Sequence, residues 1–384
     1  MKIYYWCPFI GKVATISAVI NSIKSLNKFS KNQFKPSILN VVGEWNEKKN
    51  ILDKYNIGLV NLRKTNIIKY LPKLGFLFSR MTYIIIFFLS ASKLHNFLKE
   101  KKPDYLVVHL ITFIPLFVLF FFKYETKFIL RISGLPKLNI FRAFLWKKIN
   151  KKIYIVTCPT LSTLDLLKKK SIFDKEKLIY LPDPIIDIKS IQTKKKSLND
   201  EIKKYPISKE NSLISIGRLT KQKNFNFLIE TFYLLIKKYK NLNLIILGDG
   251  EEKKQLEEKI NKLNLQKKVF LIGYKNNIFP YLLNSKIFVL SSLWEDPGFV
   301  LIEAGISNVP VMSSNCPNGP IEIIENNRNG FLYKTNSKED FLNTFDDFIK
   351  SKTSDIKKKK INLKKKCREF TLFNHYRILK KIFR

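Results

Sequence analysis

The apolar positions in the first half of the chain alternate between short runs of β-type residues and longer stretches with helical spacing. Apolar stretches with helical periodicity cover Ala14–Leu26 and Ile84–Leu98. Such alternation predicts βαβ units and a mostly parallel sheet. The strands that this pattern predicts are Ile3–Trp6, Ser37–Val42, Tyr105–Leu110, Lys127–Arg131, Ile153–Thr157 and Leu178–Leu181.

The same pattern restarts in the second half of the chain. Helices are predicted at Phe225–Tyr239, where apolar residues recur at helical spacing, and at Glu251–Leu263. The strands predicted between and after these helices are Leu213–Ile216, Asn243–Leu247, Val269–Ile272, Ile287–Leu290 and Val309–Met312. The restart indicates a second doubly wound α/β domain.

The break between the two patterns sets the predicted domain boundaries. Pro182-Asp183-Pro184 leads into a polar, lysine-rich segment with little apolar content. We therefore predict an N-terminal domain over residues 1–187 and a linker or surface insertion over 188–210. A C-terminal domain follows over 211–365, and residues 366–384 form a closing helix, centred on Phe373–Phe383. A chain of 384 residues is long enough for two such domains.

One apolar stretch is long enough to be compared with a membrane span. Tyr105–Phe122 contains no charged side chain, but its β-rich start and Pro115, which suits a first helical turn, favour a strand, a short loop and a buried helix. A second run, Met81–Ala91, is too short to cross a bilayer. The N-terminus starts like a strand and has no apolar segment typical of a signal peptide.

The charge is strongly positive. The chain has 70 Lys and Arg against 31 Asp and Glu, a formal net charge of +39. Such a surface attracts polyanions, including anionic lipid, although heavy use of Lys, Asn and Ile throughout is also typical of an AT-rich coding sequence. The segment Phe141–Lys152 mixes aromatic and basic residues and fits either an anionic membrane surface or a helix packed on its domain. We find no known nucleic-acid-binding motif.

Cysteine and histidine are scarce. The four cysteines are far apart in sequence and only three histidines occur, so we expect neither a disulfide framework nor a metal centre. The expected location is the cytoplasm, with possible attachment to the inner face of the plasma membrane.

The strongest chemical signal follows the predicted strand Ile287–Leu290. In the run Asp296-Pro297-Gly298-Phe299-Val300, Asp296 is expected as the N-cap and Pro297 as the first helical residue. The first free backbone N–H groups, on Gly298, Phe299 and Val300, then form a site suited to a diphosphate.

Two carboxylates flank this helix start. Glu295 lies in the preceding loop, and Glu303 is expected about two turns into the helix. A carboxylate can accept hydrogen bonds from the adjacent hydroxyls of a ribose or hexose. A loop glutamate and a solvated helix glutamate would look the same, but the apolar neighbours of Glu303 argue against a solvated position.

A second constellation follows the strand Leu213–Ile216. Arg218 comes directly after the strand, and Lys223 precedes the next helix. Two cations at a strand end can bind a pyrophosphate and stabilise its charge as it leaves. Both could also be ordinary surface cations, and this alternative is stronger for Lys223 because lysine is so common here.

Taken together, these motifs resemble glycosyltransferase family 4, whose members have the GT-B fold. The resemblance covers residues 211–335 and rests on the order and spacing of the motifs. These are Gly217-Arg218 with Lys223, Gly248-Asp249-Gly250, Val269–Gly273, and Glu295 with Glu303. The run Ser313–Ile324 is similar to bacterial members that build surface polysaccharides. The implied fold is α/β, with two Rossmann-like domains and a cleft between them that holds the donor.

The resemblance also implies residue roles. Arg218 and Lys223 would bind the donor diphosphate, Glu303 the ribose and Glu295 the transferred sugar. Phe299 and Val300 would offer backbone N–H groups, and Gly248 would approach the donor. The segment containing Tyr274 would line the nucleobase pocket. The family retains anomeric configuration and needs no metal ion, so no cofactor is expected.

In the N-terminal half the resemblance is weaker. Gly11 is the only glycine in a loop that is glycine-rich in relatives, where it approaches the donor phosphate. His109 ends a predicted strand, where relatives place a histidine near the sugar; a core histidine fits equally well. Arg131 also ends a strand and could face the acceptor.

The sequence therefore predicts a retaining hexosyl- or N-acetylhexosaminyltransferase. The expected donor is a UDP-sugar, with GDP-sugar as an alternative, and the acceptor is a saccharide or a lipid-linked saccharide of surface polysaccharide synthesis. The expected catalytic residues are Glu295, Arg218, Lys223 and His109. The alternatives are another GT-B enzyme of the nucleotide-sugar 2-epimerase type, or a polyanion- or membrane-binding protein without catalysis.

Overall fold

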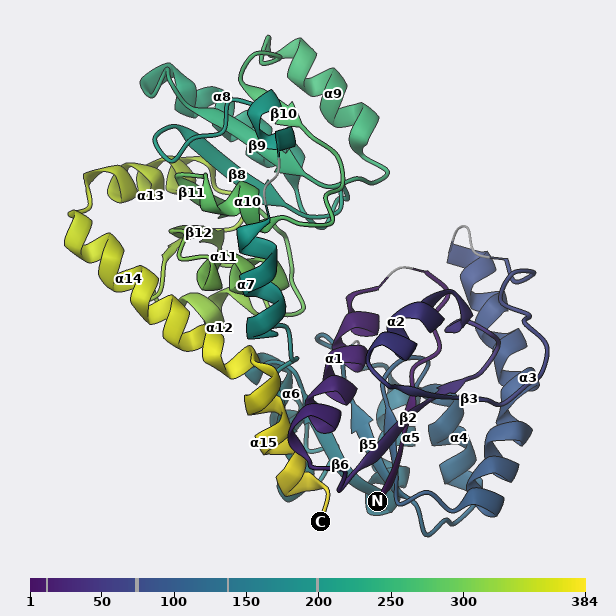
Figure 1. Ribbon diagram of the computed structural model, residues 1–384. Coiled ribbons are helices and arrows are strands. Elements are labelled where there is room, and N and C mark those ends of the chain that lie inside the picture. The colour runs from purple at the N-terminus through teal and green to yellow at the C-terminus, as the bar shows by residue number, and fades with distance from the viewer. Residues whose placement is uncertain (12, 73–75, 137, 198–199) are drawn as a thin grey trace. The chain divides into compact units, whose positions relative to one another are not determined.

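The computed structural model describes residues 1–11, 13–72, 76–136, 138–197 and 200–384. These residues form two compact units (Figure 1). Unit 1 comprises Met1–Ile185 and Leu372–Arg384, and unit 2 comprises Ile186–Thr371. The last helix, α15 (Leu372–Ile382), thus returns to unit 1, where it packs against α1 (Ala14–Phe29).

Unit 1 is built on a seven-stranded parallel sheet in the order β3-β2-β1-β4-β5-β6-β7. The strands are β1 (Lys2–Trp6), β2 (Lys35–Asn40), β3 (Gly58–Asn61), β4 (Tyr105–Val108), β5 (Lys127–Arg131), β6 (Ile153–Cys158) and β7 (Leu178–Tyr180). The other helices are α2 (Lys49–Lys54), α3 (Phe76–Lys101), α4 (Phe113–Phe121), α5 (Ile140–Ile149) and α6 (Leu161–Lys170). The strands are apolar on both faces because helices cover both faces of a parallel sheet.

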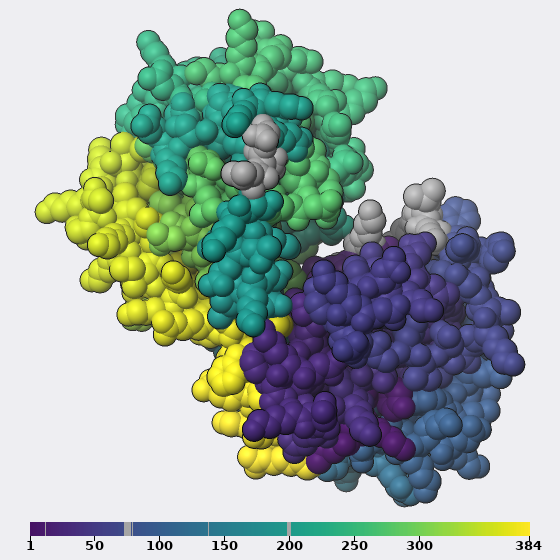
Figure 2. Space-filling model, viewed as in Figure 1, coloured from purple at the N-terminus to yellow at the C-terminus, as the bar shows by residue number. Residues whose placement is uncertain are grey.

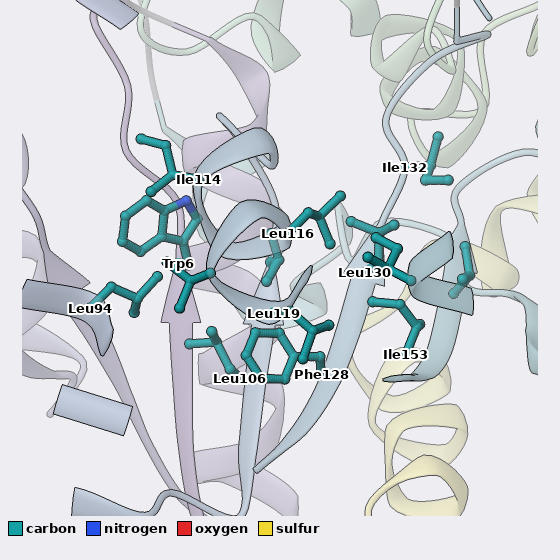
Figure 3. Close-up of a cluster of buried hydrophobic side chains, with 14 of the residues drawn as sticks. Trp6, Leu94, Leu106, Ile114, Leu116, Leu119, Phe128, Leu130, Ile132 and Ile153 are labelled. Atoms are coloured by element: carbon teal, nitrogen blue, oxygen red, sulfur yellow. The ribbon is translucent and has the colours of Figure 1, made fainter. Parts of the chain in front are cut away.

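Two hydrophobic clusters, one containing Trp6 and the other Tyr5, stabilise unit 1. Side chains that alternate along β1 point to opposite faces of the sheet, so these neighbours enter different clusters. The first cluster also contains Leu94 of α3, Leu116 of α4 and Phe128 of β5 (Figure 3). The second contains residues of α1 and α15, which explains why the C-terminal helix belongs to this unit.

Unit 2 is built on a six-stranded parallel sheet in the order β10-β9-β8-β11-β12-β13. The strands are β8 (Ser212–Ile216), β9 (Asn243–Leu247), β10 (Val269–Leu271), β11 (Ile287–Leu290), β12 (Val311–Ser314) and β13 (Phe331–Tyr333). The helices are α7 (Ile188–Lys196), α8 (Phe225–Lys238), α9 (Lys253–Lys262), α10 (Phe279–Leu283), α11 (Phe299–Ile306), α12 (Pro320–Ile324), α13 (Lys338–Lys350) and α14 (Thr353–Lys366). The strand order reverses between β8 and β11, where ligands of such folds bind.

The two-domain α/β prediction is confirmed, and most predicted strands agree with the structure within two residues. Two short edge strands, β3 and β13, were not predicted. The segment 188–210, predicted as a linker or insertion, contains α7 and a 3-10 turn at Asp200–Lys204. Helix α7 is polar and buries only Ile191, so its sequence gave no apolar period; its atoms lie on the surface of unit 2 (Figure 2).

The stretch Tyr105–Phe122 is a strand followed by helix α4, as expected. The run Met81–Ala91, expected to be too short to cross a membrane, is part of the longer helix α3, whose helical residues continue through a more polar segment to Lys101. Arg80–Lys101 is long and apolar enough to span a membrane by length and composition, with a mean hydropathy of 1.3 and 28% of its apolar window buried.

Candidate donor site in unit 2

The candidate site starts at the end of β8, at the reversal of strand order. Arg218 follows the strand and is exposed. Within the described residues, its guanidinium has no hydrogen-bond or ion-pair partner. The side chain of Lys223 lies over Gly217, where a Cβ atom would come within 2.9 Å of it. A free guanidinium at this position can bind a diphosphate in a bidentate way.

Glu295 and Lys223 form a buried ion pair. The Lys223 ammonium lies 2.5 Å from Glu295 Oε1, and the two side chains are 14% and 5% exposed. The Ser292 hydroxyl donates to the same oxygen at 2.5 Å. The two predicted residues are therefore in direct contact. The positive charge of Lys223 balances the negative charge of Glu295, and Glu295 in turn holds the Lys223 side chain in place.

The loop carrying Glu295 is fixed by a second loop after β12. The Asn318 amide donates to the Glu295 carbonyl at 3.1 Å, and the Glu295 N–H donates to the Pro317 carbonyl at 3.3 Å. A Cβ atom on Gly319, whose φ is +133°, would lie 1.9 Å from the Pro297 carbonyl. Only glycine permits this contact of backbone against backbone. The sequence pattern did not reveal this support, because the contact joins residues far apart in sequence.

The helix α11 begins later than predicted. Gly298, with φ of +91°, is the N-cap, and Asp296 and Pro297 lie in the preceding loop, joined by a cis peptide bond. The left-handed backbone at the cap suits glycine and not aspartate. The N–H groups of Phe299 and Val300 have no acceptor in the part of the chain that the structure describes. These N–H groups and the helix dipole favour an anion at this point.

Glu303 lies about one turn into α11, not two, because the helix starts at Phe299. Its side chain is half-buried, and no hydrogen-bond partner for its carboxylate occurs among the described residues. Burial raises the pKa of Glu303 to about 7, and the charge of Lys194 in α7 opposes this shift. A partly desolvated carboxylate with unused acceptor oxygens is suited to bind neighbouring hydroxyls.

Three strand-end loops are locked together beside Arg218. A Cβ atom on Gly248, whose φ is +146°, would lie 1.7 Å from the Gly217 carbonyl. The Gly248 N–H donates to the Gly273 carbonyl at 3.0 Å, and the Leu219 N–H donates to the Asp249 carbonyl at 3.0 Å. Gly248 is therefore required by close backbone packing, which holds the loop of Arg218 in place.

The predicted nucleobase segment is held by the segment that was expected to be a linker. Lys275 forms an ion pair with Glu201, which raises the pKa of that lysine. The Tyr281 hydroxyl donates to the other Glu201 oxygen at 3.2 Å. Tyr274 itself is 72% exposed, so its ring is available to stack on a planar ligand. The contribution of Glu201 was missed because a lone acidic residue in a polar stretch gives no signal.

The predicted N-terminal residues lie in unit 1. Gly11 is exposed, and a Cβ atom there would meet nothing within 4 Å. His109 is buried, and its Nδ1 atom has no hydrogen-bond partner within the described residues. Burial and the nearby charge of Arg131 hold the pKa of His109 well below its usual value, so the ring is neutral.

Arg131, which was expected to face an acceptor, is buried. It forms an ion pair with Asp183, with the Nη2 and Oδ1 atoms 2.5 Å apart. A nearby second histidine, His375, donates from Nδ1 to the Pro182 carbonyl (2.8 Å), and its Nε2 atom is hydrogen-bonded to Ser22 Oγ (2.9 Å). Burial lowers the pKa of His375 to about 3. Within unit 1, these contacts join α15 to α1 and to the loop after β7, and join that loop to β5. No sequence motif indicated this arrangement.

The described residues contain no group of three or more His, Cys, Asp or Glu side chains arranged to bind a metal ion. All four cysteines are buried and unpaired.

Comparison with known proteins defines the class of the fold. The structure matches that of a glycosyltransferase from Rickettsia africae with a TM-score of 0.73 and 17% identity, covering 100% of this chain and 97% of that one. It matches Anabaena Alr3699/HepE in complex with UDP with a TM-score of 0.76 and 14% identity, covering 99% of both chains. The fold is GT-B, the two-domain architecture of these glycosyltransferases.

The sequence comparisons are more specific for unit 2. Residues 198–370 match the family model of glycosyl transferases group 1. An uncharacterised glycosyltransferase of Methanocaldococcus jannaschii is 36% identical over 60% of this chain, and one of Haemophilus influenzae is 28% identical over 53%. The matches span 60% and 55% of those two relatives. The matched family region contains every site residue described in unit 2.

Proposed function

We propose that this chain is a glycosyltransferase that moves a hexose or N-acetylhexosamine from a UDP-sugar to a saccharide or lipid-linked acceptor in surface polysaccharide synthesis. The observation that supports this proposal is a set of polar groups at one edge of the unit 2 sheet that have no partner among the described residues. These groups are the Arg218 guanidinium, the N–H groups at the start of α11 and the Glu303 carboxylate. Together they match the charges and hydroxyls of a nucleoside diphosphate.

The site residues suggest how the reaction would proceed. Arg218 and the start of α11 would bind the diphosphate and stabilise the charge that develops on it as the sugar leaves. Glu303 would accept hydrogen bonds from the ribose. Glu295, held by Lys223 and Ser292, would orient the transferred sugar. We propose retention of anomeric configuration, with the leaving phosphate accepting the proton of the acceptor hydroxyl.

The nature of donor and acceptor is supported by relatives. Anabaena Alr3699/HepE has been crystallised with UDP and with UDP-glucose. A relative from Escherichia coli, 34% identical over 35% of this chain, is named as a UDP-Gal:alpha-D-GlcNAc-diphosphoundecaprenol alpha-1,3-galactosyltransferase. Another, from Erwinia amylovora, is an amylovoran biosynthesis glycosyltransferase. We extend this donor and acceptor chemistry to the present chain.

We further propose that the reaction takes place in the cytoplasm. The four buried, unpaired cysteines are typical of a reducing compartment.

Turnover of a donor panel tests the proposal. The full chain is incubated with UDP-, GDP- and dTDP-sugars, a lipid-linked saccharide acceptor and EDTA, and nucleotide release and product anomer are measured. Release of UDP with an α-linked product from an α-linked donor is the expected result. Interconversion of the donor sugar at C2 without transfer would identify an epimerase, and the proposal would then be wrong.

A further inference from the structure

An unusual surface of unit 1 lies far in sequence from the candidate donor site. Helix α3 is apolar on both of its faces. Its inner face carries Ile86, Leu94 and Leu98, which are fully or almost fully buried in the core. Its outer face carries Met81, Ile84 and Phe88 at helical spacing, and these are 52%, 57% and 76% exposed. The outer face of a helix that packs on a soluble domain is normally polar.

Helix α4 extends this exposed surface. Phe113, Phe120 and Phe121 share one helical face and are 43%, 37% and 59% exposed. The ring of Phe87 joins the two helices, since its centroid lies 5.5 Å from that of Phe113 and 4.9 Å from that of Phe117. Helix α4 contacts α3 and lies beside part of it (Figure 1).

Helix α5, which contacts α4, also carries exposed apolar side chains. Ile140, Phe141 and Phe144 are 91%, 66% and 54% exposed. We call the exposed apolar side chains of α3, α4 and α5 the aromatic face. Large contiguous apolar surfaces of this kind mark sites of interaction.

The charged residues of the three helices are almost all basic. The only acidic residue in the three helices is Glu100, near the end of α3, whereas α3 and α5 contain seven basic residues. Lys148 lies over the ring of Phe144, 5.6 Å from its centroid. Aromatic side chains flanked by cations are the composition that inserts into the interface of an anionic bilayer.

We propose that the aromatic face docks this protein onto an anionic lipid bilayer without spanning it. Helix α3 is not a membrane span in this arrangement, because its inner face packs in the core and Thr82 and Ser90 are buried there with hydrogen-bonded hydroxyls. A second copy of the chain is disfavoured as the occupant, because it would bring the same positive surface against itself. The bilayer offers both a hydrophobic layer and negative charge.

This docking goes beyond glycosyl transfer and does not depend on it. Vesicle flotation tests it with the full chain and with two vesicle types, phosphatidylcholine alone and phosphatidylcholine mixed with phosphatidylglycerol. The first variant is Phe88→Ser/Phe121→Ser/Phe141→Ser, which changes one exposed ring on each helix. The second is Lys147→Gln/Lys148→Gln, which removes two exposed charges of α5.

Matched controls come from α14. This helix contains more lysines than α5 but has a single large exposed apolar residue, Ile361. The controls are Ile361→Ser and Lys357→Gln/Lys358→Gln. Size-exclusion chromatography reports the oligomeric state, and thermal melts confirm that each variant is folded.

We expect the wild type to bind the anionic vesicles and to bind neutral ones far more weakly. The ring variant should lose about 100-fold in affinity, and the α5 charge variant about 20-fold. Both α14 controls should bind within about twofold of wild type, because they lie outside the aromatic face.

Three results would overturn the docking proposal. They are no binding of the wild type to either vesicle, an equal loss in the α14 controls, and a wild-type dimer that the ring variant abolishes. The last result would make the aromatic face an interface between copies of the chain.

Discussion

The two units have the same kind of parallel sheet but use the carboxyl ends of their strands differently. In unit 2, Arg218 at the end of β8 and Glu303 in α11 have no hydrogen-bond or ion-pair partner among the described residues. In unit 1, the polar residues at the corresponding edge, His109 and Arg131, are buried, and Arg131 is paired with Asp183. Shared topology therefore does not imply shared function, because the exposure of the strand-end residues decides what they can bind.

The largest effect is expected from Glu295, because it holds Lys223 in place. Glu295→Gln removes the charge that pairs with Lys223 at 2.5 Å, and sugar transfer should fall about 100- to 1000-fold. Transfer is measured at saturating UDP-sugar. The matched control is Glu257→Gln on the exposed side of α9, which should leave the rate unchanged. A Glu295→Gln protein that is folded and transfers sugar at half the wild-type rate would contradict the role of this carboxylate.

The next effect is on nucleotide affinity. Arg218→Ala should weaken UDP binding about 10- to 100-fold, because a charge-assisted bidentate contact is lost. Calorimetry should show almost no change for uridine, which has no phosphates. Lys221→Ala, which removes a nearby exposed cation, serves as the control. Equal weakening of UDP and uridine would show that Arg218 does not contact the diphosphate.

Glycine replacement compares the two units directly. Gly248→Ala in unit 2 places a Cβ atom 1.7 Å from the Gly217 carbonyl at a φ of +146°, and should lower the free energy of unfolding by about 1–3 kcal/mol. Gly11→Ala in unit 1 meets nothing within 4 Å and should have an effect near zero. Urea unfolding measures both. Similar losses at both positions would contradict the packing account of the unit 2 loops.

The smallest effect concerns pH. Because the pKa of Glu303 is raised to about 7, its carboxyl is mostly protonated below that value and ionised above it. Hydrogen bonds from ribose hydroxyls favour the ionised form, so uridine affinity should rise about tenfold from pH ~6 to pH ~8. Uridine is used because it has no phosphate that titrates in this range. Glu303→Gln should remove the dependence, and a variant that keeps it would place the titrating group elsewhere.

Sequence patterns predicted the parallel core of each unit well because buried parallel strands are continuous apolar runs. The bounds of β9 and β11 agree exactly with prediction. Edge strands such as β3 (Gly58–Asn61) are short and half-exposed, so their pattern is weak. Helix α7 was not predicted because a helix that buries only Ile191 has no apolar period.

The candidate site was predictable in composition but not in its contacts. The motif spacing selected Arg218, Lys223, Glu295 and Glu303. It did not reveal that Lys223 is paired with Glu295 or that Asn318 supports the same loop. Such contacts join distant segments and follow from the loop geometry around Gly298 and Gly319. The burial of Arg131, the last residue of β5, was not predicted because its partner, Asp183, lies far away in sequence.

The most direct test of the central claim is a crystal structure of the full chain with UDP. The account predicts that the diphosphate lies against the Arg218 guanidinium and the N–H groups at the start of α11, with the ribose hydroxyls on Glu303. UDP bound away from these residues, or no UDP bound at saturating concentration, would contradict the assignment of the donor site to this edge of unit 2.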